Sequence, residues 1–118
     1  MLCPSRELAS QTTQVIQDLT NSCGGIIRCI DIGAKDVAAV KPLLKDLPDV
    51  LVGTPGRLLT HIKEGNLDLS SSLQLLVIDE ADLIFSFGFE ADLRFLLGKF
   101  PSIYQVRIIF NFIKKPHL

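Results

Sequence analysis

The chain has 118 residues, a formal net charge of −1 and an apolar fraction of 47%, which permit one domain with a modest core and exclude a disordered chain. The near-zero net charge gives no global sign of nucleic-acid binding, so any such contact must come from a few placed groups. Three cysteines without a CxxC pair argue against a disulfide framework or a zinc site and favour a reducing, intracellular compartment. No apolar run reaches the length of a bilayer span, so we expect no membrane partner.

Helical and extended patterns alternate from the N-terminus onward. Apolar residues at helical spacing predict a helix over residues 5–21, with Ser5 as its N-cap. Residues 26–32 are predicted to form a strand. A helix is then expected over residues 36–47, although Pro42 should kink or shorten it.

The second half of the chain continues this alternation. Residues 49–53 indicate a short buried strand, and Thr54 should cap a helix that has Pro55 at its first position. Residues 73–78 predict another apolar strand, and the last strand is expected over residues 105–110. An amphipathic helix lies between these two strands, and its predicted apolar face comprises Phe89, Leu93, Leu96, Leu97 and Phe100.

Apolar strands separated by helices predict an α/β fold, in which a parallel sheet carries helices on both faces. In sheets of this kind, ligands bind outside the carboxyl ends of the strands. Residues 4–7, 54–57 and 79–82 stand at three of these predicted ends. Parallel packing would place all three segments on one edge, which we expect to be the functional face.

Two carboxylates, Asp79 and Glu80, directly follow an apolar strand. This is the Walker-B arrangement, in which a strand-end aspartate holds Mg²⁺, usually through water, beside a nucleotide. The adjacent glutamate can polarise the water that attacks the γ-phosphate. An ordinary solvated junction between strand and turn is the alternative for so short a pattern. His61 has no patterned partner and is expected to be a structural histidine at the surface or partly buried, and Cys29 is expected to be a small core residue.

The longer string over residues 77–82, Val-Ile-Asp-Glu-Ala-Asp, resembles the signature of the DEAD-box RNA helicases. Residues 4–9, Pro-Ser-Arg-Glu-Leu-Ala, are similar to motif Ia of that family, with a serine in place of the usual threonine. Residues 54–57, Thr-Pro-Gly-Arg, match motif Ib. The resemblance implies an incomplete, RecA-like ATP-binding domain over residues 1–110, followed by a divergent tail over residues 111–118.

The resemblance also implies an activity, that of an ATP-dependent RNA helicase with ATP and Mg²⁺ as cofactors. Such an enzyme couples RNA-stimulated ATP hydrolysis to remodelling of RNA duplexes or ribonucleoprotein particles. By this resemblance Asp79 would hold Mg²⁺ through water and, with Glu80, contact the nucleotide. Glu80 would activate water, and Asp82 would couple the two domains of the enzyme.

RNA contact has a physical basis at two predicted helix starts, because helix N-termini present free N–H groups and a positive dipole end that suit phosphate. The resemblance implies a grip on the sugar-phosphate backbone with little preference for base. A salt bridge with a neighbouring acid is the alternative role for Arg6. The residues expected to contact RNA are Ser5, Arg6, Gly33, Thr54, Gly56 and Arg57.

The sequence of residues 82–90 resembles that of a nucleolar subgroup of the family, which acts in assembly of the large ribosomal subunit. This resemblance implies a location in the nucleus and nucleolus, with pre-ribosomal particles as partners.

Several family features do not occur in the sequence. There is no Gly-x4-Gly-Lys-Ser/Thr string and no Ser-Ala-Thr motif, and Met1 falls where the family has the middle of a strand. We therefore expect the phosphate-binding loop upstream and the isolated chain to be a fragment without catalytic turnover. Two alternatives are an inactive module that binds the RNA backbone and a non-functional remnant that does not fold stably.

Overall fold

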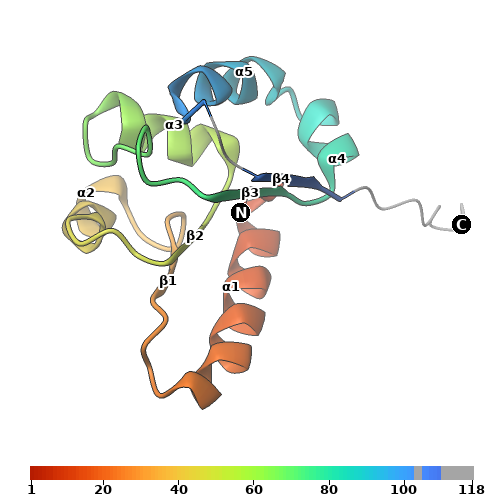
Figure 1. Ribbon diagram of the computed structural model, residues 1–118. Helices are drawn as coiled ribbons and strands as arrows, with labels where there is room; N and C mark the ends of the chain where they lie inside the picture. Colours follow the sequence, from red (N-terminus) through yellow and green to blue (C-terminus); the bar gives the residue numbers. More distant parts are fainter. Residues whose placement is uncertain (103–104, 110–118) are drawn as a thin grey trace, which may run out of the picture.

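The computed structural model describes residues 1–102 and 105–109, and within them it contains a parallel sheet with helices on both faces (Figure 1). The predicted α/β class is therefore confirmed. The strands pair as β1 with β2 and as β3 with β4, both pairs parallel. Their bounds are β1 (Cys29–Asp31), β2 (Val50–Val52), β3 (Leu75–Ile78) and β4 (Gln105–Ile108).

The first three residues join the two strand pairs into one sheet. Leu2 forms isolated parallel bridges with Gly53 and with Ile78. The N–H of Leu2 donates to the carbonyl of Val77 at 2.7 Å, and the N–H of Cys3 donates to that of Gly53 at 2.9 Å. The N-terminal segment therefore acts as the central strand, between β2 and β3, as expected for a chain whose first residue falls within a strand.

Helices cover the two faces of this sheet unequally (Figure 1). α1 packs on β1 and β2 from one side, whereas α3 and α5 pack together on the other side. No described helix is long and apolar enough to cross a membrane. The helices are α1 (Arg6–Thr20), α2 (Val37–Val40), α3 (Pro55–Lys63), α4 (Ala81–Ser86) and α5 (Glu90–Lys99), with 3₁₀ turns η1 (Asn21–Cys23) and η2 (Lys41–Leu44).

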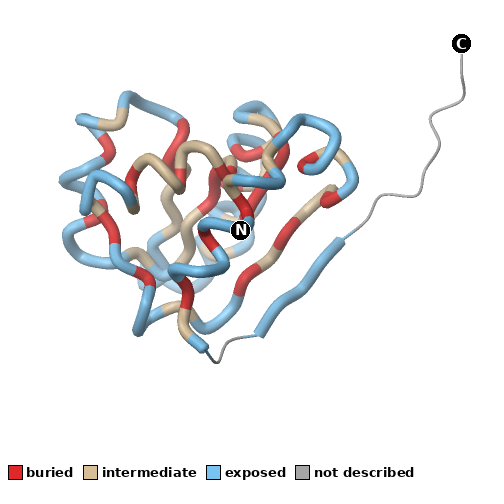
Figure 2. Tube along the Cα trace, turned by 90° about the horizontal axis from the view of Figure 1, so that it is seen from above, coloured by how far each residue is buried: buried red, intermediate tan, exposed pale blue. Residues whose placement is uncertain are grey.

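The two faces have separate apolar cores, and the alternation of strand residues decides which core each side chain enters. Leu2 and Leu76 pack in the larger core with α3, α4 and α5, whereas Cys3 and Val52 pack in the smaller core under α1. β4 is exposed along its whole length and is the pale blue strand at the edge of the sheet in Figure 2.

Several predicted boundaries differ from the structure, and the first strand is the clearest case. The strand expected over residues 26–32 is limited to β1, and Ile26 is 81% exposed. In the parallel ladder the N–H of Val50 donates to the carbonyl of Arg28. The next rung toward the N-terminus would need a donor from Pro48, which has no N–H, so the pairing ends there.

The helical predictions are confirmed in outline, including the shortening at Pro42, and they are wrong about two features, α4 and Leu97. Pro42 shortens the helix expected over residues 36–47, because α2 ends at Val40 and the chain continues as the 3₁₀ turn η2. α4 was not predicted, since only Ala81 and Ile84 of its six residues are buried and no helical period can develop. Leu97 does not belong to the apolar face of α5, because it is 42% exposed.

Two further predictions concern the C-terminal end of the chain. The strand expected over residues 105–110 is observed as β4, ending at Ile108, and residue 110 lies outside the described residues. The boundary between a domain over residues 1–110 and a tail over residues 111–118 also lies outside them and stays a prediction.

Candidate nucleotide and RNA interface

The predicted functional segments follow neighbouring strands of the sheet. Thr54 comes soon after β2, Pro4 after the central strand and Asp79 directly after β3. Because these strands are parallel, their carboxyl ends share one edge. The expectation that the three motif segments lie along a common edge is confirmed.

Two helices begin at this edge with the predicted caps. Ser5 is extended (φ −141°), and its Oγ accepts a hydrogen bond from the N–H of Leu8 at 3.2 Å. Thr54 caps α3 in the same way, accepting from the N–H of Arg57 at 3.4 Å, and Pro55 occupies the first helical position. The positive ends of α1 and α3 therefore both face the edge, which suits an anion.

Arg6 and Arg57 converge on the loop that follows β1. Arg6 Nη2 donates to the carbonyl of Gly33 at 3.3 Å. Arg57 Nη1 donates to the carbonyls of Lys35 at 2.8 Å and Ile32 at 3.4 Å. One loop is thus held from both helix starts. The structure brings together three predicted site residues, Arg6, Arg57 and Gly33, although the two arginines are 51 positions apart in the chain.

Among the residues that the structure describes, Arg6 forms no ion pair, so the salt-bridge alternative is not observed there. The ion pair found among residues 1–102 and 105–109 joins Arg94 to Glu90. A guanidinium group has five N–H donors, and Arg6 and Arg57 use only some of them on the loop. The remaining donors are available to a phosphate while the hydrogen bonds that orient the two side chains stay in place.

Asp31 and Gly53 complete this corner, although neither was identified as a site residue from the sequence. Asp31 Oδ1 accepts the N–H of Gly33 at 2.9 Å and so shapes the loop. A Cβ atom added to Gly53 would lie 2.4 Å from Cγ1 of Ile32, so only glycine fits there. In the sequence, Asp31 could have been found as a carboxylate two residues before Gly33, and Gly53 as a glycine directly before Thr54.

The carboxylate pair stands at the end of β3. The N–H of Asp79 donates to the carbonyl of Leu2 at 2.9 Å, and its Oδ1 accepts the N–H of Glu80 at 3.0 Å. Glu80 has φ 48° and ψ 51°, a left-handed conformation that costs about 1–2 kcal/mol in a residue with a Cβ. Strained backbone of this kind concentrates at functional sites. Both side chains are half-buried, whereas Asp82 is exposed in the first turn of α4.

The donor set at this edge fits Mg²⁺ bound together with a nucleotide. Among the described residues there is no group of three or more histidine, cysteine or acidic side chains able to hold a metal. Mg²⁺ usually keeps several waters and takes one or two carboxylates plus substrate phosphates. Asp79 at a strand end can supply one such carboxylate. The remaining ligands would then be waters and the phosphates of the nucleotide.

His61 and Cys29 pack within the fold, and His61 is buried more deeply than the surface or partly buried position expected from the sequence. His61 is fully buried, and its Nδ1 lies 3.1 Å from the side-chain nitrogen of Asn66. Burial, and then the charge of Arg57, lowers the pKa of His61 below its ordinary value. Burial likewise raises the pKa of the Cys3 and Cys29 thiols, so both remain protonated small core groups.

The chain is similar to curated RNA helicases over most of its own length. It is 43% identical over 102 residues to the ATP-dependent RNA helicase dbp9 of Schizosaccharomyces pombe, which covers 86% of this chain and 17% of that protein. It is 35% identical over 106 residues to the probable ATP-dependent RNA helicase ddx56 of Dictyostelium discoideum, covering 89% of this chain and 16% of that protein. The chain therefore spans about a sixth of the length of these relatives.

Solved structures agree with this similarity. The crystal structure of a DEAD box protein from the hyperthermophile Methanococcus jannaschii matches 96% of this chain and 30% of that chain, with a TM-score of 0.78 and 30% identity. The yeast DEAD-box splicing factor Prp28 matches 98% of this chain and 27% of that chain, with a TM-score of 0.83 and 27% identity. The sheet and helices described above thus form part of a RecA-like domain.

A family model described as DEAD/DEAH box helicase matches residues 1–111, which include the caps of α1 and α3, the loop between them and the carboxylates after β3. The chain belongs to the DEAD/DEAH box helicase family.

Proposed function

We propose that this chain is the part of an ATP-dependent RNA helicase that connects the RNA backbone to the nucleotide site. The observation that carries this proposal is the shared edge, where two helix starts and a strand-end carboxylate pair follow neighbouring parallel strands. Leu2 and Asp79 are hydrogen-bonded to each other there. This hydrogen bond joins the backbone at the carboxylates to the strand that leads into α1, the helix proposed to contact RNA.

On the nucleotide side, Asp79 would hold Mg²⁺ through water and Glu80 would orient and polarise a water molecule. The ion supplies positive charge to the phosphate oxygens when it is bound. Asp79 and Glu80 would together contact the ATP complex, and the exposed carboxylate of Asp82 would couple this domain to a second one. The hydrogen bond from the backbone N–H of Glu80 to Asp79 Oδ1 supports the role of Asp79, because it orients that carboxylate at the end of β3.

On the RNA side, the free N–H groups at Ser5, Thr54 and Gly56 and the guanidinium groups of Arg6 and Arg57 would bind the phosphates. Gly33 would allow close approach of the loop backbone. These are contacts to the sugar-phosphate chain, so binding should depend little on base identity. The convergence of both arginines on one loop supports the assignment, because it brings both guanidinium groups to the same short segment after β1.

RNA binding is tested by fluorescence anisotropy with a single-stranded oligonucleotide across a series of salt concentrations. The double variant Arg6→Ala/Arg57→Ala should bind more weakly, and the slope of log K against log salt should fall by about 1.4, at roughly 0.7 for each phosphate that is no longer neutralised. The matched control Lys45→Ala/Arg94→Ala removes the same charge from exposed residues away from this edge, before the start of β2 and on α5, and should change the slope little. Equal slopes in both variants would show that only the net charge matters.

ATP hydrolysis separates an enzyme from a module that only binds RNA. We expect the purified chain to show no turnover above the Glu80→Gln variant, with or without RNA, because its sequence has no phosphate-binding Gly-x4-Gly-Lys-Ser/Thr string. RNA-stimulated turnover that Glu80→Gln abolishes would contradict this expectation and assign catalysis to the chain itself. A chain that neither binds RNA nor unfolds cooperatively would be a non-functional remnant.

A nucleolar location and pre-ribosomal particles as partners are part of the same proposal. The sequence of residues 82–90 and the similarity to the dbp9 and ddx56 helicases support this location and these partners. Fluorescence imaging of the tagged protein beside a nucleolar marker, with sedimentation on a sucrose gradient, tests both. Uniform cytoplasmic fluorescence and migration as free protein would refute them.

A further inference from the structure

The loop that follows β1 holds both arginines of the proposed RNA site. Arg6 donates to the carbonyl of Gly33 at 3.3 Å. Arg57 donates to the carbonyls of Ile32 at 3.4 Å and Lys35 at 2.8 Å. All three acceptors are neutral groups, so these hydrogen bonds orient the two guanidinium groups without cancelling their charge. The position of this loop therefore decides where two positive charges stand at the edge of the sheet.

Packing fixes only the first part of this loop. Ile32 and Gly33 are buried, whereas Ala34, Lys35 and Asp36 are exposed. An open hollow of about 310 Å³ lies beside the loop and is lined by residues of α1, β1 and α2 as well as by Ala34 and Lys35. Segments with few buried apolar contacts open at little cost in free energy. Hydrogen bonds, more than packing, must therefore hold the exposed part in place.

Asp31, the last residue of β1, supplies the carboxylate that shapes the loop. Its Oδ1 accepts the N–H of Gly33 at 2.9 Å, and its main-chain carbonyl accepts the N–H of Ala34 at 3.4 Å. An aspartate that bonds the backbone two residues ahead in this way fixes a turn. Gly33 lies next to both the carboxylate and Arg6, since a Cβ added there would be 3.5 Å from Asp31 Oδ1 and 3.9 Å from Cγ of Arg6. Among the described residues Asp31 forms no ion pair with an arginine, so the carboxylate orders the loop instead.

We propose that Asp31 is a positioning residue of the RNA site: its carboxylate holds the loop after β1, and the carbonyls of that loop hold Arg6 and Arg57 in place for phosphates. The inference rests on the proposed contact of these two arginines with RNA. An arginine that is already held in its binding orientation loses less freedom when RNA binds, which raises the affinity. Charge alone predicts the opposite effect, because a carboxylate near bound phosphates repels them.

The test titrates a fluorescent single-stranded RNA with the 118-residue chain and its variants, followed by anisotropy. Asp31→Ala should bind about threefold to tenfold more weakly, because the loop loses its hydrogen bond. Asp31→Asn keeps an Oδ1 acceptor without the charge and should bind at least as tightly as the parent chain. Asp31→Val lacks the acceptor but favours a strand, so it should match Asp31→Ala if lost positioning, and not a poorly formed β1, is the cause.

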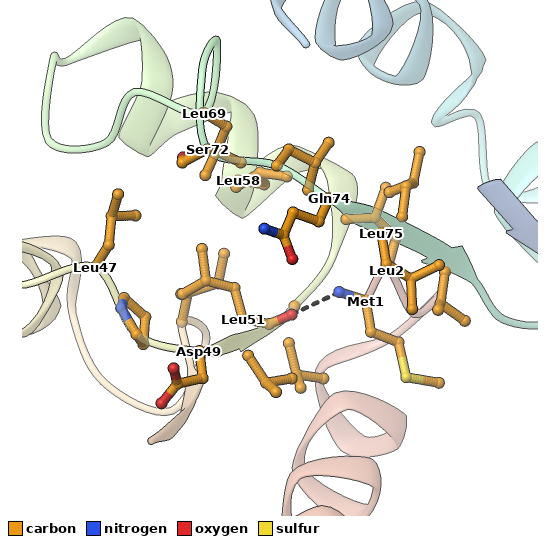
Figure 3. Close-up of a pocket in the computed structure, with 18 of the residues that line it drawn as sticks. Met1, Leu2, Leu47, Asp49, Leu51, Leu58, Leu69, Ser72, Gln74 and Leu75 are labelled. Atoms are coloured by element: carbon orange, nitrogen blue, oxygen red, sulfur yellow. Dashed lines mark hydrogen bonds between the residues drawn. The ribbon is translucent and has the colours of Figure 1, made fainter. Parts of the chain in front are cut away.

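Asp49→Ala is the matched control. Asp49 Oδ2 accepts the N–H of Arg28 at 2.8 Å, so this variant also removes one negative charge and one hydrogen bond from a backbone N–H to a carboxylate. Asp49 lies directly before β2, where it lines a pocket at the end of the strand away from the two arginines (Figure 3). Binding of RNA by Asp49→Ala should therefore not weaken.

A measurement without RNA isolates the positioning itself. Nitrogen relaxation of the arginine Nε groups, measured by NMR, should show Arg6 and Arg57 to be more mobile in Asp31→Ala than in the parent chain and unchanged in Asp31→Asn. Arg94, which pairs with Glu90 on α5, is the internal reference and should not change. In the background Arg6→Ala/Arg57→Ala, the further change Asp31→Ala should weaken RNA binding no more, because its effect acts through the two arginines.

Four results would overturn the role of Asp31 while the proposed function stands. They are tighter RNA binding by Asp31→Ala, equal weakening by Asp31→Asn or Asp49→Ala, unchanged mobility of both arginines in Asp31→Ala, and a further loss of binding when Asp31→Ala is added to the double arginine variant. A parent chain that binds RNA no better than Arg6→Ala/Arg57→Ala would instead refute the proposed RNA contact, and the role of Asp31 would fall with it.

Discussion

Gly53→Ala is a small change with a predictable effect, because the position of the added methyl group follows from the backbone. That methyl would lie 2.4 Å from Cγ1 and 2.8 Å from Cδ1 of Ile32. Ile32 is only 1% exposed and cannot turn into solvent. Gly53 also joins β2 to the central strand, since its N–H donates to the carbonyl of Met1 at 3.1 Å, so the backbone cannot withdraw without breaking that hydrogen bond.

The expected decrease in the free energy of unfolding of Gly53→Ala is the difference between two effects. Overpacking a filled core costs about 1–3 kcal/mol. Replacing glycine by alanine where φ is not positive stabilises a protein by about 0.4–1 kcal/mol through the unfolded chain, and Gly53 is not among the glycines with positive φ. The net result should be a decrease of about 1–2 kcal/mol in the free energy of unfolding.

Urea unfolding followed by far-UV circular dichroism measures this change, since the chain has no tryptophan and one tyrosine. The midpoint should fall for Gly53→Ala while the m-value stays constant. Gly98→Ala is the matched control, because a Cβ at this position in α5 meets no atom within 4 Å. That variant should raise the midpoint, because alanine in a helix is more stable than glycine by about 0.5–1 kcal/mol in the free energy of unfolding.

A midpoint for Gly53→Ala at or above that of the parent chain would refute the steric argument. The double variant Gly53→Ala/Ile32→Ala removes both clashing atoms and leaves Cβ of Ile32 at 3.9 Å. It should be more stable than the sum of the single changes predicts, by at least about 0.5 kcal/mol. Additive losses would place the effect of Gly53→Ala somewhere other than Ile32.

Three further predictions concern the caps, the strained turn and the buried histidine. Ser5→Ala should lower the free energy of unfolding by about 1 kcal/mol, because the N–H of Leu8 loses its acceptor, and a denaturation curve that does not move would contradict the cap. Glu80→Gly should raise the free energy of unfolding by about 1 kcal/mol, because it relieves the left-handed backbone, and it should abolish any chemistry of the carboxylate. The control Asp82→Gly, in the first turn of α4, should lower the free energy of unfolding instead. His61 has a lowered pKa in the folded chain, so the unfolded state binds more protons near and below the ordinary value of 6.5. Stability should therefore be full above that pH and decrease as the pH falls through 6.5 toward the lower folded pKa. Melting temperatures at pH 7.5 and 5.5 measure this decrease, and it should be smaller in His61→Leu; equal decreases in both chains would assign the effect to other groups.

Local features of this protein were predictable from the sequence because their causes are local. Ser5 and Thr54 accept hydrogen bonds from residues three positions away, and Pro42 ends a helix through its own missing N–H. The apolar run before Asp79 is a strand, because a parallel strand covered by helices needs apolar residues throughout. The order of these motifs was also sufficient to identify the family.

Tertiary structure decided whatever depends on partners that are distant in the chain. The first three residues form the central strand only because β2 and β3 lie on either side of them. Arg6 and Arg57 meet because the loop after β1 passes between two helix starts, and Gly53 is required because Ile32 fills the adjoining space. Leu96 is buried and Leu97 exposed because one face of α5 packs on α3. Spacing along a chain specifies periodicity, whereas burial and contact depend on which surfaces the folded sheet brings together.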